Sequence, residues 1–491
     1  MITERTRPRP DDYFKDWKER EALAEAMIPL VGKLSRENAV KTYIYGRSLV
    51  NRSVLDIMQD HRYVRQVERN ELSEKETFPV IKALSSLDLG TAHIDVGRIA
   101  VGYESEGKPA GLSVKKYVKQ QVADLIGSNA KPIDQPRDVV LYGFGRIGRL
   151  MARLLVEKAD GGDALRLRAV VVRKGKAAND LIKRATLLQR DSVHGPFNGT
   201  IRVDEEHNSM VANGNEIKVI YADAPEDIDY TQYGIKDAII IDNTGAWRDE
   251  EGLSRHLKAK GAAKVILTAP GKGDMKNIVY GINNDEIGPD DQLISAASCT
   301  TNAIAPPLKA LDDEYGIDHG HVETVHAYTN DQNLIDNYHK ANRRGRSAAL
   351  NMVLTETGAA TAVGKVLPQL NGKLTGNAIR VPTPNVSMAI LNLTLNRETT
   401  REEVNEYMRR MALHSPLRKQ IDYSDSPEVV STDFVGSRHA CVFDAEATIV
   451  SGNHVTMYFW YDNEFGYSCQ VHRILEQMAG VHYAIYPKSE A

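Results

Sequence analysis

The chain has few cysteines, no long apolar run and no excess of either charge, and each of these absences excludes a class of protein. Its three cysteines, Cys299, Cys441 and Cys469, match neither a disulfide framework nor the ligand spacing of a zinc site. We therefore expect a reducing compartment and no bound metal. No segment is apolar for long enough to cross a bilayer, and the first dozen residues lack the apolar centre of a signal peptide. A cytoplasmic protein without a membrane partner is expected.

The charges nearly balance, because 62 basic residues stand against 66 acidic ones, for a net formal charge of −4. Neither a basic excess nor a run of like charge indicates binding to nucleic acid. A chain of 491 residues is long enough for two or three domains.

Residues 1–130 are expected to form an α-helical N-terminal extension. Two apolar stripes recur at nearly helical spacing, and they comprise Ala39, Tyr43, Val50, Val54 and Ile57, then Val114, Tyr117, Val118, Val122 and Leu125. Ser73 to Glu76 fit a capping box before an apolar stretch. We interpret the stripes as core faces, although composition does not separate a small helical domain from a regulatory module. The proline-rich segment 129–136 is typical of a linker.

From Asp138 onward, strands alternate with helices. The apolar run Val139–Tyr142 predicts a buried strand, and Gly143-Phe144-Gly145-Arg146-Ile147-Gly148 then leads into a helical pattern. A GxGxxG motif alone is weak evidence, but a strand before it and a helix after it are typical of a dinucleotide-binding turn. The glycines permit close backbone approach, and the helix N-terminus receives the pyrophosphate.

The next predicted strand ends in Arg173-Lys174, where an NAD-preferring protein has an acidic residue that binds the ribose 2′-hydroxyl. Paired cations attract a 2′-phosphate, so the sequence favours NADP or dual use of NAD and NADP. Asp180 follows a few residues later and keeps NAD open as an alternative.

Further along, Asn213-Gly214 predicts a hairpin between two short strands. Strands are also predicted at 238–241 and 265–267, and polar loops with Thr244 and Thr268 follow them. Loops at the carboxyl ends of parallel strands face the ligand in such sheets.

Cys299 is the candidate nucleophile. It follows the apolar run Leu293–Ala297 and precedes Thr-Thr-Asn, as if a strand delivers it to a helix start, where free N–H groups lower the pKa of a thiol. His326, in Thr-Val-His-Ala-Tyr-Thr, supplies a base. A lone cysteine among small residues is more often a buried packing residue, so these flanking motifs carry the argument.

The sequences Ala-Ser-Cys-Thr-Thr-Asn and Val-His-Ala-Tyr-Thr-Asn-Asp-Gln resemble the phosphorylating glyceraldehyde-3-phosphate dehydrogenase family, and the resemblance runs from about Arg137 to about Gly480. It implies an α/β fold in which residues 137–298 form a Rossmann NAD(P)-binding domain. A C-terminal helix within 464–491 completes that domain. Residues 299–463 form an α+β catalytic domain with a mixed or antiparallel sheet.

The resemblance also implies the roles of the site residues. Cys299 attacks the aldehyde as a thiolate, and His326 stabilises it and accepts the proton of the hemithioacetal. Thr244 and Thr268 lie near the nicotinamide, and Asn463 orients its carboxamide. The resemblance places the C3 phosphate of the substrate on Thr329, Asp331 and Arg380, and the attacking inorganic phosphate on Ser298, Thr300, Arg344, Thr357 and Gly358.

The resemblance also implies a pathway and an assembly. The expected reaction is the reversible oxidation of glyceraldehyde 3-phosphate in glycolysis or gluconeogenesis, and the expected enzyme is a homotetramer. Phe465 replaces a usual tryptophan, and the loop before Arg343 is one residue shorter, which makes the assembly less certain than the chemistry. An erythrose-4-phosphate or other semialdehyde dehydrogenase is an alternative. So is a nucleotide-sensing regulatory protein that uses the extension to contact a partner.

Overall fold

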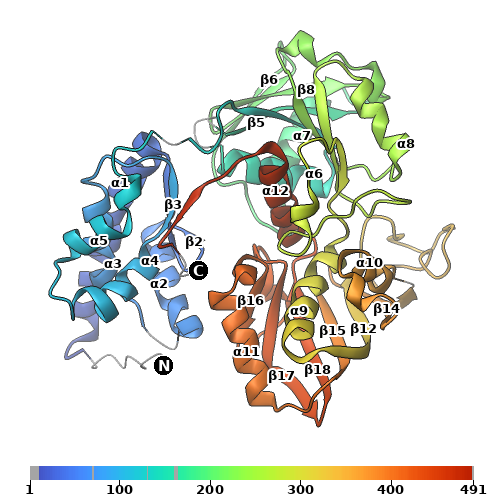
Figure 1. Ribbon diagram of the computed structural model, residues 1–491. Coiled ribbons are helices and arrows are strands. Elements are labelled where there is room, and N and C mark those ends of the chain that lie inside the picture. Colours follow the sequence, from blue (N-terminus) through green and yellow to red (C-terminus); the bar gives the residue numbers. More distant parts are fainter. Residues whose placement is uncertain (1–9, 69–70, 130, 160–163, 356, 489–491) are drawn as a thin grey trace. The chain divides into compact units, whose positions relative to one another are not determined.

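The computed structural model describes residues 10–68, 71–129, 131–159, 164–355 and 357–488, and the chain divides into two compact units (Figure 1). The first unit contains the described residues up to Pro136 and those from Val481 onward, and the second contains Arg137–Ala159 and Leu165–Gly480. Among the described residues, we find no helix with the length and apolar character that a membrane crossing requires.

The N-terminal unit is mainly helical, as the sequence predicted. Its helices are α1 (Tyr13–Asn38), α2 (Val54–Glu68), α3 (Glu74–Leu84), α4 (Val96–Gly102) and α5 (Val114–Gln121). The predicted capping box at the start of α3 is confirmed, because the Ser73 hydroxyl accepts from the first turn and the Glu76 carboxylate returns to the Ser73 N–H at 2.8 Å. The second predicted stripe is also confirmed, since Tyr117 and Val118 are buried on α5.

The first predicted stripe does not form one helix. Ala39 adopts a left-handed conformation and ends α1, and the chain then forms the hairpin of β1 (Val40–Ile44) and β2 (Arg47–Ser48) before α2 begins. Apolar residues of a strand and of the following helix happened to lie at nearly helical spacing. Such spacing is ambiguous for short apolar runs.

A four-stranded sheet lies in the N-terminal unit, in the order β19-β3-β1-β2, with β3 at Ala92–Asp95. Its edge strand β19 (Ala484–Tyr486) comes from the C-terminus and pairs in parallel with β3. The C-terminal helix that we expected within 464–491 is therefore shorter. It is α12 (Phe465–Ala479), which ends where Gly480 adopts a left-handed conformation.

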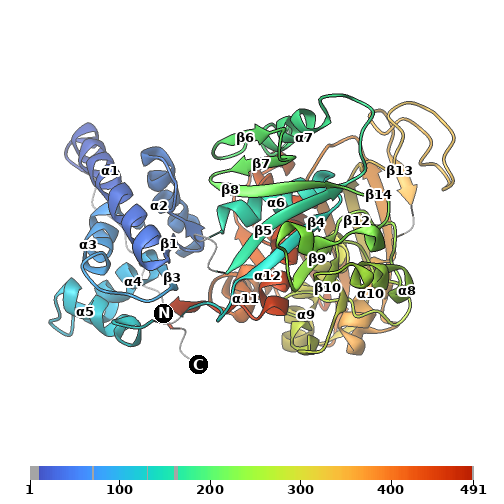
Figure 2. The same ribbon diagram turned by 90° about the horizontal axis from the view of Figure 1, so that it is seen from above.

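The nucleotide-binding half of the second unit is built on an eight-stranded sheet in the order β11-β10-β9-β4-β5-β8-β7-β6. Five of these pairings are parallel, and β9, β4 and β5 run side by side in Figure 2. The strands are β4 (Arg137–Tyr142), β5 (Leu165–Val172), β6 (Ile201–Asp204), β7 (Ser209–Ala212), β8 (Asn215–Tyr221), β9 (Ala238–Asp242), β10 (Ala262–Leu267) and β11 (Leu293–Ser295).

This half has the Rossmann architecture that the sequence predicted. Its helices are α6 (Arg146–Glu157), α7 (Asp180–Gln189), α8 (Glu250–Leu253) and α12. The predicted hairpin is confirmed, because Ala212 pairs with Asn215 across a two-residue turn in which Asn213 and Gly214 both have positive φ.

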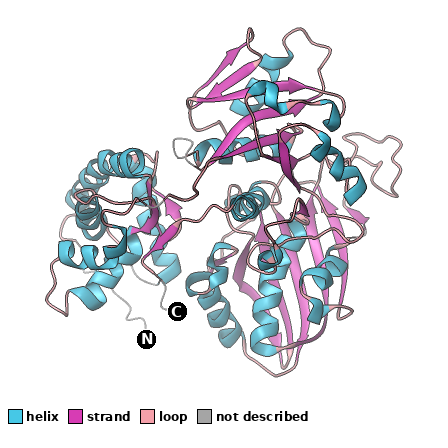
Figure 3. Cartoon of the chain, turned by 45° about the horizontal axis from the view of Figure 1, so that its top comes forward, coloured by secondary structure: helices cyan, strands magenta, loops and turns pink. Residues whose placement is uncertain are grey.

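The other half of the second unit is a seven-stranded mixed sheet in the order β13-β14-β12-β15-β18-β17-β16, and helices lie against one of its faces (Figure 3). Its strands are β12 (Ile317–Ala327), β13 (Val353–Thr355), β14 (Leu374–Val381), β15 (Ser387–Leu395), β16 (Ile421–Ser424), β17 (Cys441–Ser451) and β18 (His454–Tyr461), and its helices are α9 (Cys299–Tyr315), α10 (Ala359–Val366) and α11 (Arg401–His414).

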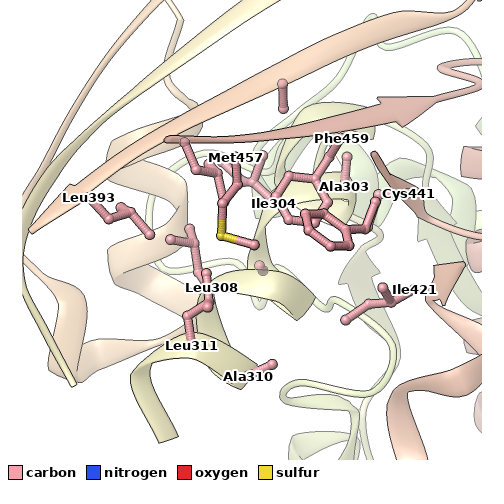
Figure 4. Close-up of a cluster of buried hydrophobic side chains, with 14 of the residues drawn as sticks. Ala303, Ile304, Leu308, Ala310, Leu311, Leu393, Ile421, Cys441, Met457 and Phe459 are labelled. Carbon is pink, nitrogen blue, oxygen red and sulfur yellow. The ribbon is translucent and has the colours of Figure 1, made fainter. Parts of the chain in front are cut away.

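Helix α9 is fixed by the core of this half (Figure 4). Its Ile304, Leu308 and Leu311 are fully buried and belong to one cluster with Met457 and Phe459 of β18. Burial of side chains of this size stabilises the fold by roughly 1.5–3 kcal/mol each. The first residue of α9 is Cys299, so the packing of the helix on the sheet determines where the thiol lies.

Candidate active site

Cys299 stands at a strand-to-helix turn. Strand β11 ends at Ser295, Ala297 takes a φ of 55°, and Ser298 caps α9 by accepting the N–H of Thr301 at 3.0 Å. The Ser295 hydroxyl accepts the Ala297 N–H at 3.0 Å and stabilises this turn. Cys299 thus lies in the first turn of a 17-residue helix, and its side chain is partly exposed, as a nucleophile requires.

His326 lies next to the end of β12 and faces the thiol. Its Nε2 is 3.5 Å from the Sγ of Cys299, and its ring is buried. Its Nδ1 is 2.7 Å from the carbonyl oxygen of Ala327 and 2.7 Å from Nη1 of Arg380. A guanidinium only donates, whereas a carbonyl only accepts. When Nδ1 carries the proton and donates to Ala327, Nε2 presents a lone pair to Sγ, as a base must.

Burial disfavours the charged form of both the Cys299 thiol and the His326 imidazole. It raises the pKa of the Cys299 thiol, although Arg380 and Thr300 act in the opposite direction. It also lowers the pKa of His326 to about 3, and the positive charge of Arg380 contributes to that shift. These pKa shifts favour a neutral thiol beside a neutral imidazole, and the geometry allows the proton to pass from Sγ to Nε2 when the sulfur attacks a carbon.

A row of polar side chains continues from His326. Nη1 of Arg380 lies 3.5 Å from the Thr329 hydroxyl, and that hydroxyl donates to the Asp331 carboxylate through a very short hydrogen bond. Nη1 of Arg344 pairs with the other oxygen of Asp331 at 2.5 Å, and Nη2 of Arg344 donates to Thr355 at 3.1 Å. The pairing of β12 with β14 places His326 opposite Arg380, so the register of these two strands determines where the row begins.

Four further predicted anion-binding residues occupy helix starts. Thr357 and Gly358 precede α10, and the Thr357 hydroxyl accepts the N–H of Ala359 at 3.2 Å. Thr300 lies in the first turn of α9, where its hydroxyl is 3.0 Å from that of Tyr461. The Ser298 hydroxyl is the cap of α9. Helix starts suit anions because their first N–H groups lack partners in the helix.

The glycine-rich turn has the shape that a dinucleotide needs. Gly143 has a φ of 92°, and a Cβ there would lie 2.9 Å from the Thr244 methyl group. A Cβ on Gly148 would lie 2.3 Å from the Gly143 carbonyl oxygen, whereas Gly145 faces open space at the start of α6. These residues fit a pyrophosphate held at the helix start. Phe144 is buried and Ile147 partly buried in the same turn.

At the end of β5, Arg173 and Lys174 are exposed. The acidic alternative, Asp180, accepts from Arg184 at 2.7 Å. Burial works to raise the pKa of Asp180, but its bonds to Arg184, Tyr221 and the Gly175 N–H outweigh burial, and the pKa is lowered. Asp180 is therefore an ionised and paired carboxylate, while the two cations stand at the strand end.

The predicted nicotinamide loops follow β9 and β10. The N–H and hydroxyl of Thr244 both donate to the Asp242 carboxylate at 2.7 Å, and the Thr268 hydroxyl donates to the Asp242 carbonyl oxygen at 3.0 Å. The side-chain oxygen of Asn463, after β18, accepts from Ser387 at 2.9 Å. The hydrogen bond from Ser387 turns the oxygen of the Asn463 side-chain amide toward β15.

Two features were missed in the sequence. The Ser387 hydroxyl also accepts the Ala327 N–H at 3.1 Å, so it bridges the residue after His326 to Asn463. Arg146 pairs with Glu464 at 2.5 Å, which ties the fingerprint helix to the residue after Asn463. Arg146 and Glu464 are 318 residues apart in sequence, and no local pattern connects them.

Comparison with known proteins gives the following matches. The family model for the NAD-binding domain of glyceraldehyde 3-phosphate dehydrogenase matches residues 137–250. The family model for the C-terminal domain of the same enzyme matches residues 298–463. A glyceraldehyde-3-phosphate dehydrogenase-like protein of Pseudomonas aeruginosa is 64% identical over 464 residues, which cover 94% of this chain and 100% of the relative.

Shorter relatives match about 70% of the chain. Glyceraldehyde-3-phosphate dehydrogenase of Kitasatospora aureofaciens is 41% identical over 70% of this chain and 98% of its own length. Glyceraldehyde-3-phosphate dehydrogenase 2 of Bacillus subtilis is 41% identical over 70% of this chain and 96% of its own length. A match over 94% of the chain must include much of the N-terminal extension, so the Pseudomonas protein shares it.

Proposed function

Because the chain belongs to the glyceraldehyde-3-phosphate dehydrogenase family and is thus an oxidoreductase with an NAD-binding domain, we propose that it oxidises glyceraldehyde 3-phosphate to 1,3-bisphosphoglycerate. The reaction consumes inorganic phosphate and NAD or NADP, is reversible, and serves glycolysis or gluconeogenesis. The observation that carries this proposal is the Cys299–His326 pair, 3.5 Å apart, at the head of a row of hydroxyls and guanidinium groups.

A nicotinamide cofactor bound at the glycine-rich turn supplies the hydride acceptor. The residues that would hold it are Gly143, Phe144, Gly145, Arg146 and Ile147 at the turn, with Thr244, Thr268 and Asn463 toward the nicotinamide. The side chain of Arg146 acts indirectly, because its guanidinium is engaged by Glu464 and Asp191, so its backbone N–H is the group left for the pyrophosphate.

The chain's own chemistry begins at the thiol. His326 takes the proton of Cys299 as Sγ attacks the aldehyde carbon and passes it to the carbonyl oxygen, which gives a hemithioacetal and returns the imidazole to its neutral form. His326 then accepts the hydroxyl proton of the hemithioacetal as hydride leaves, and a thioester remains on Cys299. A phosphate oxygen attacks the thioester carbon, the C–S bond breaks, and the sulfur leaves as a thiolate that recovers its proton from His326. The product is an acyl phosphate.

Two anion subsites support phosphorolysis rather than hydrolysis. We assign the C3 phosphate to Thr329 and Arg380, with Asp331 beside them, and the inorganic phosphate to Ser298, Thr300, Arg344, Thr357 and Gly358. An ionised carboxylate only accepts hydrogen bonds, so Asp331 holds Thr329 and Arg344 rather than the phosphate itself. This revises the role that the resemblance implied for it.

For the cofactor, we propose NADP or dual use. Two cations stand at the end of β5, and the nearby carboxylate of Asp180 is paired with Arg184. A carboxylate committed to a guanidinium repels a 2′-phosphate less than a free one.

We also propose assembly into a homotetramer in the cytoplasm. The loop between β12 and β13 exposes apolar side chains, with Leu334 77% exposed, Tyr338 88% and Leu350 81%. Exposed apolar groups concentrated in one loop are typical of an interface with another protein surface. Light scattering of the purified chain tests the assembly.

Initial rates with glyceraldehyde 3-phosphate, with and without inorganic phosphate and with NAD and NADP in parallel, test the reaction. We expect turnover that requires phosphate and is faster with NADP or comparable with both cofactors. Faster turnover of erythrose 4-phosphate would instead indicate that substrate. Cofactor binding without turnover of any phosphorylated aldehyde would indicate a regulatory protein.

A further inference from the structure

We propose that Asp331 sets the specificity of this site for anions, because its carboxylate competes with an incoming phosphate group for Thr329 and Arg344. The inference rests on the proposed function and deepens it. It assigns a residue that weakens phosphate binding within a site built from phosphate-binding groups.

The contacts of Asp331 support this competition. One carboxylate oxygen accepts the Thr329 hydroxyl, and the other pairs with Nη1 of Arg344 at 2.5 Å. The remaining guanidinium nitrogens of Arg344 are 3.3 and 3.1 Å from the Thr355 hydroxyl. Each nitrogen of Arg344 therefore has a protein partner and two of its five N–H groups stay available, so a phosphate that binds at Nη1 lies next to the Asp331 carboxylate and competes with it there.

The charge of Asp331 acts in the same direction. Burial raises its pKa, but the Thr329 hydrogen bond and the charges of Arg344 and Arg380 outweigh burial, so the pKa is lowered and the group is ionised at neutral pH. The row thus carries two positive charges and one negative charge. A phosphate dianion meets a net charge of +1 there, in place of the +2 that the two arginines alone would supply.

The position of Asp331 keeps the competition reversible. Its side chain is 43% exposed and that of Arg344 is 22% exposed. Ion pairs at such positions stabilise a protein only slightly, because water and salt screen the two charges. An anion with two charges can therefore displace the carboxylate from Arg344 without unfolding the loop, at the expense of affinity.

The same loop offers a matched control. Asp336 accepts from Arg346 at 2.7 Å, and the two side chains are 56% and 68% exposed. This second carboxylate–arginine pair has no bond to the row that begins at His326 among the contacts of the described residues. Asp336→Asn removes one negative charge from the loop and leaves the row intact.

The experiment compares Asp331→Asn, Asp331→Glu and Asp336→Asn with the wild type in the full-length protein. KM is measured for inorganic phosphate, for glyceraldehyde 3-phosphate and for unphosphorylated glyceraldehyde. We expect Asp331→Asn to lower KM for inorganic phosphate, for the phosphorylated aldehyde or for both by about tenfold, equivalent to about 1.4 kcal/mol. KM for glyceraldehyde should stay within about twofold, as should every KM of Asp336→Asn. Asp331→Glu keeps the negative charge, so it should lower the phosphate KM values less than Asp331→Asn does.

The three substrates also locate the subsite. A lower KM for inorganic phosphate alone places the competition at the attacking phosphate, and a lower KM for the phosphorylated aldehyde alone places it at the C3 phosphate. Unchanged or raised KM values for both in Asp331→Asn overturn the inference, because Asp331 would then support Arg344 instead of competing with the anion.

A second readout separates this inference from the proposed function. Inorganic phosphate is titrated against the rate at which iodoacetamide alkylates Cys299, which reports anion binding without turnover. If the wild type shows no phosphate-dependent turnover, the proposed function fails, and this titration still decides the role of Asp331. About tenfold tighter protection in Asp331→Asn than in Asp336→Asn supports it, and equal protection overturns it.

Discussion

The last strand of the chain provides a prediction about the N-terminal unit. Strand β19 forms the edge of that unit's sheet, and Tyr486 within it is 2% exposed and belongs to the unit's core cluster. Its hydroxyl donates to the Asp124 carboxylate at 2.9 Å. We expect Tyr486→Ala to loosen the N-terminal unit and to leave the dehydrogenase sheet unaffected, because every one of these contacts lies within the first unit.

The structure sets the size of the effect. Removing a buried aromatic side chain costs about 3–5 kcal/mol, and Tyr486→Phe, which removes only the hydrogen bond, should cost about 0.5–1.5 kcal/mol. Ile485 is the neighbouring residue of the same strand and is 39% exposed. Ile485→Ala should cost less than about 0.5 kcal/mol, so it is the matched control.

Hydrogen exchange of the full-length protein measures these effects by segment. A loss of about 4 kcal/mol corresponds to roughly a thousandfold faster exchange of the Ala92–Asp95 amides in β3, next to β19. Exchange in Ile317–Ala327 of β12 serves as the internal reference. Equal acceleration in Ile485→Ala and Tyr486→Ala would refute the reasoning, and so would acceleration in β12. We also expect the extension to be dispensable for chemistry. Turnover should therefore be unchanged, and its loss would contradict that expectation.

Four further predictions concern the second unit. Cys299→Ser should lower turnover by at least about a thousandfold, and calorimetry should show that cofactor binding is retained. Ser387→Ala should lower kcat/KM by about tenfold, because a bridging hydrogen bond is lost. Replacing Arg173 and Lys174 by Gln should lower kcat/KM for NADP by about tenfold or more and spare NAD. Burial works to raise the pKa of Asp191, but N–H groups and Arg146 lower it to about 2. Its ionised form should therefore stabilise the fold by about 2 kcal/mol above pH 4, and acid titration of Asp191→Asn should show that this contribution is lost as the pH falls toward 2.

Features that depend on a few consecutive residues were predictable from the sequence. The glycine-rich turn, the Asn213-Gly214 hairpin, the capping box at Ser73 and the strand-to-helix turn at Cys299 all lie where the sequence placed them. Each depends on backbone conformations that a short motif dictates, such as a positive φ or a side-chain cap. These local motifs therefore predict the structure without information about distant residues.

Features that depend on distant partners were not predictable in the same way. The spacing around Tyr43 predicted a helix where the structure has a hairpin. Strand β1 pairs with β3 some fifty residues later, and that pairing overrides the local preference for a helix. The strand at Ala484–Tyr486 is three residues long and carries no strand signal of its own. Its existence depends on the edge that β3 offers. Removal of the extension as a unit therefore requires deletion of residues 481–491 together with residues 1–136.

The site itself depends on sheet register as much as on its motifs. The peptide group of Ala327 has its carbonyl oxygen within hydrogen-bond distance of His326 and Arg380, and its N–H donates to Ser387, which in turn holds Asn463. The proposed base, anion site and nicotinamide contact thus meet at Ala327, the last residue of β12, which pairs with Val381 of β14 and follows the last pair of β12 with β15 by two residues. A slip of one residue in either pairing would turn the side chains of that strand to the other face. The chemistry therefore requires both pairings in register, which explains why the motifs are spread over more than 160 residues yet must fold as one unit.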